Sequence, residues 1–141
     1  MTFESKKLIA IINDDPIISR MLSKAIATIS REDPLTFSSV ESAISSLSKY
    51  SGLKVVGILD LILNENKPLS VGELRNLKKI GFELIIVVTN SSPTLFAEHA
   101  KELSIPIENF HQTPINANEW RQFTKEFEKN YLPRFFSAVT T

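Results

Sequence analysis

Short apolar segments alternate along this chain with longer segments of mixed polarity. Residues 8–12, 55–59 and 84–88 are rich in isoleucine and valine, with no polar position inside them. A strand that is covered on both faces needs apolar side chains on both sides, so this pattern predicts central strands of a parallel sheet. Residues 35–38 and 107–110 are weaker candidates of the same kind. Together these segments predict five strands.

Each predicted strand is followed by a segment with helical spacing that opens on a helix-start signal. The signals are Asp15 before Pro16, the capping-box patterns Ser38-x-x-Glu41 and Ser70-x-x-Glu73, Ser92 before Pro93, and Asn116. Gly81 stands just past the third helical segment, where a glycine commonly ends a helix. Strands that alternate with helices in this way predict an α/β fold, a five-stranded parallel sheet with helices on both faces, of the flavodoxin-like type.

Length, charge and cysteine content narrow the class of protein. The 141 residues fit one domain, which we expect over residues 1–130, with a tail or linker stub over residues 131–141. Sixteen basic residues balance sixteen acidic ones, so no net charge favours nucleic acid or anionic membranes. There is no cysteine and no apolar run long enough to span a bilayer. We expect a soluble cytoplasmic protein.

Candidate chemistry gathers where the predicted strands end. In open parallel sheets, ligands bind beyond the carboxyl ends of the strands, where the strand order reverses. Residues 13–15, 60–64, 89–90 and 111–114 occupy those ends, and they include Asp14, Asp60 and Thr89. Each residue alone has an ordinary interpretation, since an aspartate or threonine after a strand often caps a turn. Their joint occurrence at successive strand ends favours a common site.

With these positions the chain resembles the receiver domains of response regulators over nearly its whole length. Receivers carry an acidic pair after the first strand, a phosphoacceptor aspartate after the third, a serine or threonine after the fourth and Lys-Pro after the fifth. In this chain the corresponding residues are Asn13-Asp14, Asp60, Thr89 and Thr113-Pro114. Phe110 falls where receivers usually have a switch aromatic, although the sequence alone favours an ordinary core position for it.

The resemblance implies that Asp60 accepts a phosphoryl group as an aspartyl phosphate. Mg²⁺ would be held by Asp14, Asp60 and the backbone carbonyl of Ile62. Asn13 would either hold a metal-bound water or satisfy nearby backbone groups. The hydroxyl of Thr89 would donate to the phosphoryl oxygens, and Phe110 would move into the space that Thr89 leaves.

Four positions depart from the receiver pattern. Asn13 replaces an acid, Thr113 replaces the lysine, and Asn64 and Asn90 replace a proline and a small residue. The lysine matters most, because phosphoryl transfer is stabilised mainly by positioned positive charge. Lys67, in the loop after Asp60, is a candidate replacement that the sequence does not place.

Two functional hypotheses follow, and neither is an enzyme. The first is a phosphorelay receiver whose partner is a sensor histidine kinase or a phosphotransfer protein. The alternative is a pseudo-receiver, which acts as a phosphorylation-independent interaction module. The resemblance also suggests a homodimer.

A flavin protein of the same topology is disfavoured because carboxylates in loop 13–16 would repel a phosphate. His99 and His111 lack metal-ligand spacing, and the aromatics from Tyr131 onward would either fold back onto the domain or dock a partner.

Overall fold

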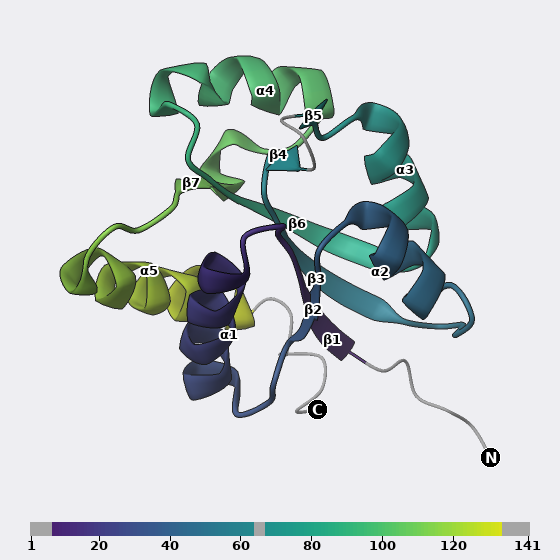
Figure 1. The fold of residues 1–141 in the computed structure, drawn as a ribbon, viewed down its shortest axis with the longest axis horizontal. Helices are drawn as coiled ribbons and strands as arrows, with labels where there is room; N and C mark the ends of the chain where they lie inside the picture. Colours follow the sequence, from purple (N-terminus) through teal and green to yellow (C-terminus); the bar gives the residue numbers. More distant parts are fainter. Residues whose placement is uncertain (1–6, 64–66, 134–141) are drawn as a thin grey trace.

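A parallel sheet forms the centre of the protein, as the computed structural model shows for residues 7–63 and 67–133 (Figure 1). Its strands are β1 (Lys7–Ile12), β2 (Leu35–Phe37), β3 (Lys54–Leu59), β6 (Phe82–Thr89) and β7 (Phe110–Gln112). They lie in the order β2-β1-β3-β6-β7, and every neighbouring pair is parallel. The chain order therefore reverses between β1 and β3, which is where such sheets place a ligand. The predicted five-stranded parallel sheet is confirmed.

Helices cover both faces of this sheet (Figure 1). They are α1 (Pro16–Ser30), α2 (Val40–Leu47), α3 (Val71–Lys79), α4 (Phe96–Leu103) and α5 (Ala117–Asn130). Helices α1 and α5 pack on one face, and α2, α3 and α4 pack on the other. The predicted arrangement with helices on both faces is confirmed. No helix of the described residues is long and apolar enough to cross a membrane.

The apolar strands supply two hydrophobic cores at once. In β1, Ile9 and Ile11 pack under α1 and α5, whereas Ala10 and Ile12 pack under the other three helices. Successive side chains of a strand point to opposite faces, so a strand between two helical layers has no position for a polar residue. This is why the central strands appear in the sequence as uninterrupted apolar runs.

Most helix starts follow the predicted capping residues. Asp15 caps α1, its Oδ1 accepting from the amide of Ile17 at 2.8 Å. Ser70 and Glu73 form a reciprocal capping box at α3. The predicted box at Ser38 is wrong: Ser39 is the N-cap of α2, and its hydroxyl accepts from Ser42. The helix begins at the buried residue Val40, one position later than the pattern predicts, so Ser39 occupies the N-cap position.

The fifth predicted strand lies later than expected. Residues 107–109 form a 3₁₀ turn, η2, and strand β7 begins only at Phe110. Asn109 ends this turn buried, with its side-chain amide donating to the carbonyl of Ile85 at 3.1 Å. Ile107 points outward and is 52% exposed, so the apolar pattern there does not mark a strand.

Two further segments were not predicted in their observed form. Ser92 caps a 3₁₀ turn, η1 (Pro93–Leu95), and α4 starts after it. Between β3 and α3, the short strands β4 (Ile62–Leu63) and β5 (Lys67–Pro68) pair antiparallel. Buried Leu61 and Leu69 close the base of this hairpin through a backbone hydrogen bond of 2.7 Å. Asn64 lies outside the described residues.

Gly81 follows the C-cap of α3 with a φ of 121°, as the sequence predicts for a helix-ending glycine. A Cβ atom at this position would come within 2.3 Å of the carbonyl oxygen of Leu53. The glycine therefore allows the chain to pass directly from α3 into β6 across the end of the sheet.

Candidate functional site

Backbone hydrogen bonds continue the sheet just beyond the carboxyl ends of its strands and bring the predicted site residues together. The amide of Asp60 donates to the carbonyl of Ile12 at 3.0 Å, so Asp60 lies beside the start of the loop that carries Asp14. On the next pair of strands, the amide of Thr113 donates to the carbonyl of Thr89 at 2.9 Å. The four strand ends thus form one edge, as the β-α alternation predicts.

Asp60 is half-buried at this edge, and its pKa is raised above the ordinary value. Burial is the main cause, because it disfavours the charged carboxylate, and the negative charge of Asp14 adds to it. Hydrogen bonding from the backbone of Ile62, the hydroxyl of Thr89 and the backbone of Leu61 opposes the rise. The amide of Ile62 donates to Oδ1 of Asp60 at 3.2 Å. Asp60 is therefore a carboxylate held in place beside another negative charge.

Asp14 and Asp60 are a donor set that suits magnesium. Mg²⁺ is commonly bound through one or two carboxylates, with water and phosphate oxygens filling the other positions. A divalent cation would also relieve the repulsion that helps raise the pKa of Asp60. Within residues 7–63 and 67–133, no three His, Cys, Asp or Glu side chains gather into a metal-binding group. The residues present thus fit a water-rich Mg²⁺ site better than a transition-metal site.

Asn13 is buried and is used by the local backbone. Its Oδ1 accepts from the amide of Asp15 at 2.8 Å, and its carbonyl accepts from the hydroxyl of Ser19 at 3.4 Å. Of the two roles that the sequence left open, these contacts fit the local one. They hold the turn that leads from β1 into α1 and so position Asp14.

Thr89 is buried at the end of β6, with 1% of its surface exposed. Its hydroxyl accepts from the amide of Ser91 at 3.3 Å and lies 3.4 Å from the hydroxyl of the same residue. It also lowers the pKa of Asp60, which requires the two side chains to be close. The predicted hydroxyl thus stands beside the predicted carboxylate.

Phe110 and His111 are neighbouring residues of β7 that face opposite sides of the sheet. Phe110 is 6% exposed, and its ring centre lies 5.6 Å from that of Phe96 in α4. His111 faces α5 and packs edge-on against Phe123 at 6.0 Å. Burial lowers the pKa of His111, and the negative charge of Glu126 opposes that effect. The side chains of β7 therefore contact both α4 and α5.

Tyr131 joins His111 at the C-terminal end of α5. Its hydroxyl donates to the carbonyl of Glu108 at 3.2 Å and bonds to Nε2 of His111. Tyr131 is 3% exposed, so this first residue of the expected tail packs on the domain itself. Residues 134–141 lie outside the described residues, and the expected domain division stays a prediction.

The position that is usually lysine holds a buried neutral side chain, Thr113, with 5% of its surface exposed. Lys67 is exposed on β5. No lysine or arginine of the described residues is among the groups that shift the pKa of Asp60. Lys67 is therefore not among the groups that shift the pKa of Asp60.

Comparison with known proteins identifies the fold. No model of a protein family and no curated protein matches the chain. Among solved structures, it is similar to a response regulator receiver protein from Pseudoalteromonas atlantica, with a TM-score of 0.62 and 22% identity over 86% of this chain and 94% of that one. It is also similar to the REC domain of the response regulator PhyR from Erythrobacter litoralis, with a TM-score of 0.57 and 18% identity over 90% of this chain and 92% of that one.

A third similar structure is the response regulator RcsB from Salmonella typhimurium, with a TM-score of 0.57 and 20% identity. The alignment covers 98% of this chain and 61% of that longer one. The chain therefore has the fold of a response-regulator receiver domain, and the resemblance stated from its strand-end residues is confirmed at the level of the fold.

Proposed function

We propose that this domain is a receiver in a two-component phosphorelay and that Asp60 accepts the phosphoryl group. One observation carries the proposal: Asp14 and Thr89, from the two strand ends that flank Asp60, both act on its carboxylate. A nucleophile, a second acidic ligand and a hydroxyl donor are the groups that this transfer needs. Their occurrence together at the switch point of the sheet is more specific than any one of them.

The proposed step is an exchange of bonds at phosphorus. A carboxylate oxygen of Asp60 attacks the phosphorus of a phosphohistidine, the phosphorus–nitrogen bond breaks, and the imidazole leaves and takes up a proton from solvent. Bound Mg²⁺ would neutralise charge on the phosphoryl oxygens, with Asp14, Asp60 and the Ile62 carbonyl as its proposed ligands. The hydroxyl of Thr89 would then donate to a phosphoryl oxygen instead of contacting Ser91.

The output of this switch would pass through β7. Phe110 contacts α4 through Phe96, and His111 contacts Phe123 of α5 and Tyr131 just after it. A movement of Thr89 toward a phosphoryl group would free space at the end of β6, next to the end of β7. We propose that the surface formed by α4, β7 and α5 changes shape in response.

The partners follow from the same proposal. The phosphoryl donor would be a sensor histidine kinase or a phosphotransfer protein, and a cytoplasmic location goes with that donor. We propose signal relay and not an enzymatic activity, and no role in binding nucleic acid or membranes. A homodimer through the α4–β7–α5 surface would be one way to use the changed surface.

A second candidate function, the pseudo-receiver, is supported by one specific observation. Thr113 is buried where a lysine would pair with the phosphoryl group, and Asn13 has its side-chain oxygen engaged by Asp15. A site with less positive charge transfers phosphate slowly. In that case the same α4–β7–α5 surface would bind a partner without phosphorylation.

Chemical trapping distinguishes the two candidates. After incubation with acetyl phosphate and Mg²⁺, borohydride reduces an aspartyl phosphate to homoserine, and peptide mass spectrometry then locates the reduced residue. The proposal expects homoserine at position 60. Recovery of unmodified Asp60 in the folded protein, from a sample in which a known receiver is reduced normally, would favour the pseudo-receiver.

A further inference from the structure

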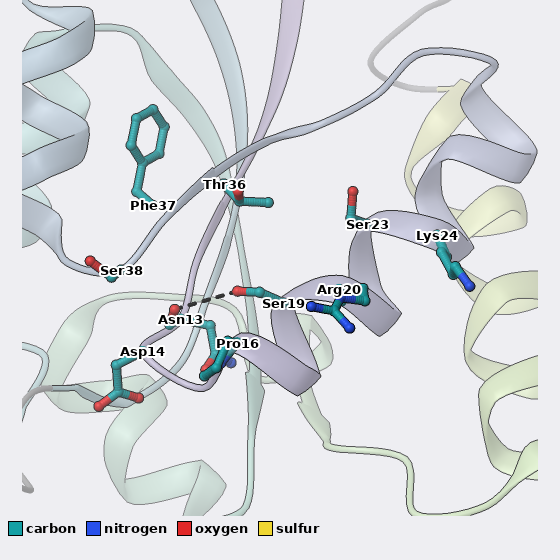
Figure 2. A pocket seen from close by; sticks show the side chains of 10 residues that line it. All are labelled: Asn13, Asp14, Pro16, Ser19, Arg20, Ser23, Lys24, Thr36, Phe37 and Ser38. Atoms are coloured by element: carbon teal, nitrogen blue, oxygen red, sulfur yellow. Dashed lines mark hydrogen bonds between the residues drawn. The ribbon is translucent and has the colours of Figure 1, made fainter.

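A pocket of about 450 Å³ lies between α1 and β2, beside the loop that carries Asp14 (Figure 2). Hydroxyl side chains line both of its walls: Ser19 and Ser23 from α1, and Thr36 and Ser38 from β2 and the residue after it. A volume of this order is typical of small-molecule sites. The pocket is distinct from the half-buried Asp60, which does not line it.

Two basic side chains, Arg20 and Lys24, complete the wall formed by α1 (Figure 2). They are four residues apart, so both lie on the same face of the helix, where like charges repel. Across residues 7–63 and 67–133, neither forms an ion pair with a carboxylate. Asp14 is the one acidic residue among those described in the lining, and Figure 2 shows its carboxylate at the opposite end from Lys24. Among the residues that the structure describes, the cations of the α1 wall therefore have no carboxylate partner.

We propose that this pocket binds a small phosphorylated ligand, with its phosphate at Arg20 and Lys24 and the hydroxyl side chains bonding to the rest of it. A guanidinium presents a planar fork of donors that matches phosphate oxygens, and a second cation one turn away matches the second negative charge of a phosphate dianion. The hydroxyls provide both donors and acceptors for a polar ligand. The chemistry of the wall selects an anion, and the size of the pocket selects a small one.

Ligand binding in this pocket would change the electrostatic environment of the phosphoacceptor site. Asp14 belongs to the lining of the pocket and also contributes to the raised pKa of Asp60. A phosphate bound at Arg20 and Lys24 would add negative charge to a pocket that Asp14 also lines. Binding in the pocket does not require that Asp60 be phosphorylated, so the two proposals can fail separately.

The test uses the full chain with Asp60→Asn, in buffer free of Mg²⁺, so that no ligand can act at the phosphoacceptor. Inorganic phosphate and inorganic pyrophosphate are the probes, added up to about 10 mM while backbone amide resonances are followed by NMR. We expect saturable shifts at Ser19, Ser23 and Thr36. Arg20→Gln and Lys24→Gln should each weaken the affinity about tenfold, as expected for the loss of a charged hydrogen-bond donor.

A matched pair of cations exists on another helix. Arg121 and Lys125 of α5 are also four residues apart and exposed, but the carboxylate of Glu126 lines the same surface as they do. Arg121→Gln and Lys125→Gln should change the affinity less than about twofold. Absence of saturable shifts, or an equal loss from the α5 variants, would overturn the proposal, because binding would then follow net charge and not the pocket.

Discussion

The backbone amide of Thr113 donates a hydrogen bond to the carbonyl oxygen of Thr89 at 2.9 Å, and both threonine side chains are buried. This bond places residue 113 beside the hydroxyl that acts on Asp60. A longer, charged side chain at the same backbone position would begin within reach of the same edge. Residue 113 therefore lies next to Thr89, but its side chain carries no charge.

Restoring that charge should speed phosphorylation. In Thr113→Lys we expect the initial rate of modification by acetyl phosphate to rise by about tenfold or more, because a positioned cation stabilises the charge that develops on the phosphoryl group. The rate is measured by intact mass over time. Gln112 is the exposed residue just before Thr113, at the end of β7, so Gln112→Lys adds the same charge at a different position. An equal rise in both variants would show that only net charge had mattered.

The same substitution should lower stability. Thr113 is 5% exposed, so its replacement places a larger and charged side chain in a filled site. We expect the free energy of unfolding to fall by about 1–3 kcal/mol relative to the native protein. Urea unfolding measures this change, and Mg²⁺ with bound phosphate should restore part of it. A fully stable Thr113→Lys would mean that the side chain reaches solvent instead of the site.

Removing the charge of Asp14 should lower the pKa of Asp60. Asp14 is one of two causes that raise this pKa, and burial, the larger cause, would remain. The Asp60 carboxyl is titrated by ¹³C NMR in Asp14→Asn without Mg²⁺. Asp15→Asn is the control, since asparagine also caps a helix and should keep α1 intact. An unchanged pKa in Asp14→Asn, or the same fall in the control, would contradict the assigned interaction.

Asp60 should cost stability at neutral pH. Its pKa is raised in the folded state, so the unfolded state releases the proton first as the pH rises through the ordinary value of 3.8. The penalty is then complete above the folded pKa and absent below 3.8. We expect Asp60→Asn to be more stable than the native protein at pH 7, with the difference shrinking as the pH falls toward 4. Urea unfolding across this range measures it, and exposed Asp33→Asn should show no such trend.

Tyr131 should be needed for full stability of the domain. Its hydroxyl bonds to His111 and to the carbonyl of Glu108, and its ring packs on Phe127 at 5.2 Å. A chain ending at residue 130 should lose about 2–4 kcal/mol of unfolding free energy relative to one ending at residue 133. Equal stability of the two truncated chains would contradict a stabilising role for Tyr131 and would support a domain boundary at residue 130.

Parts of this structure were predictable because their causes are local. Apolar runs that must fill two cores at once predict β1, β3 and β6, and Asp15 and Ser70 cap helices through their own next few residues. The choice of Ser39 over Ser38 was not predictable by the same means, because the two serines are adjacent and only the burial of Val40 distinguishes them.

Other features depend on contacts between distant residues. The start of β7 is set by the bond from Asn109 to Ile85, and Tyr131 reaches back twenty residues to His111. The residues of the site were predictable by position, since strand ends share an edge. That Asn13 is engaged by Asp15, and that Asp14 raises the pKa of Asp60, depends on side-chain geometry that a sequence pattern does not contain.

The central claim is that Asp60 accepts a phosphoryl group, and intact mass tests it most directly. The native protein and Asp60→Asn are incubated in parallel with acetyl phosphate, with and without Mg²⁺, alongside a receiver known to be labelled. We predict the mass gain of one phosphoryl group in the native protein with Mg²⁺ and no gain in the other three samples. A folded native protein that gains no mass while the control receiver is labelled, or an equal gain in Asp60→Asn, would contradict the claim.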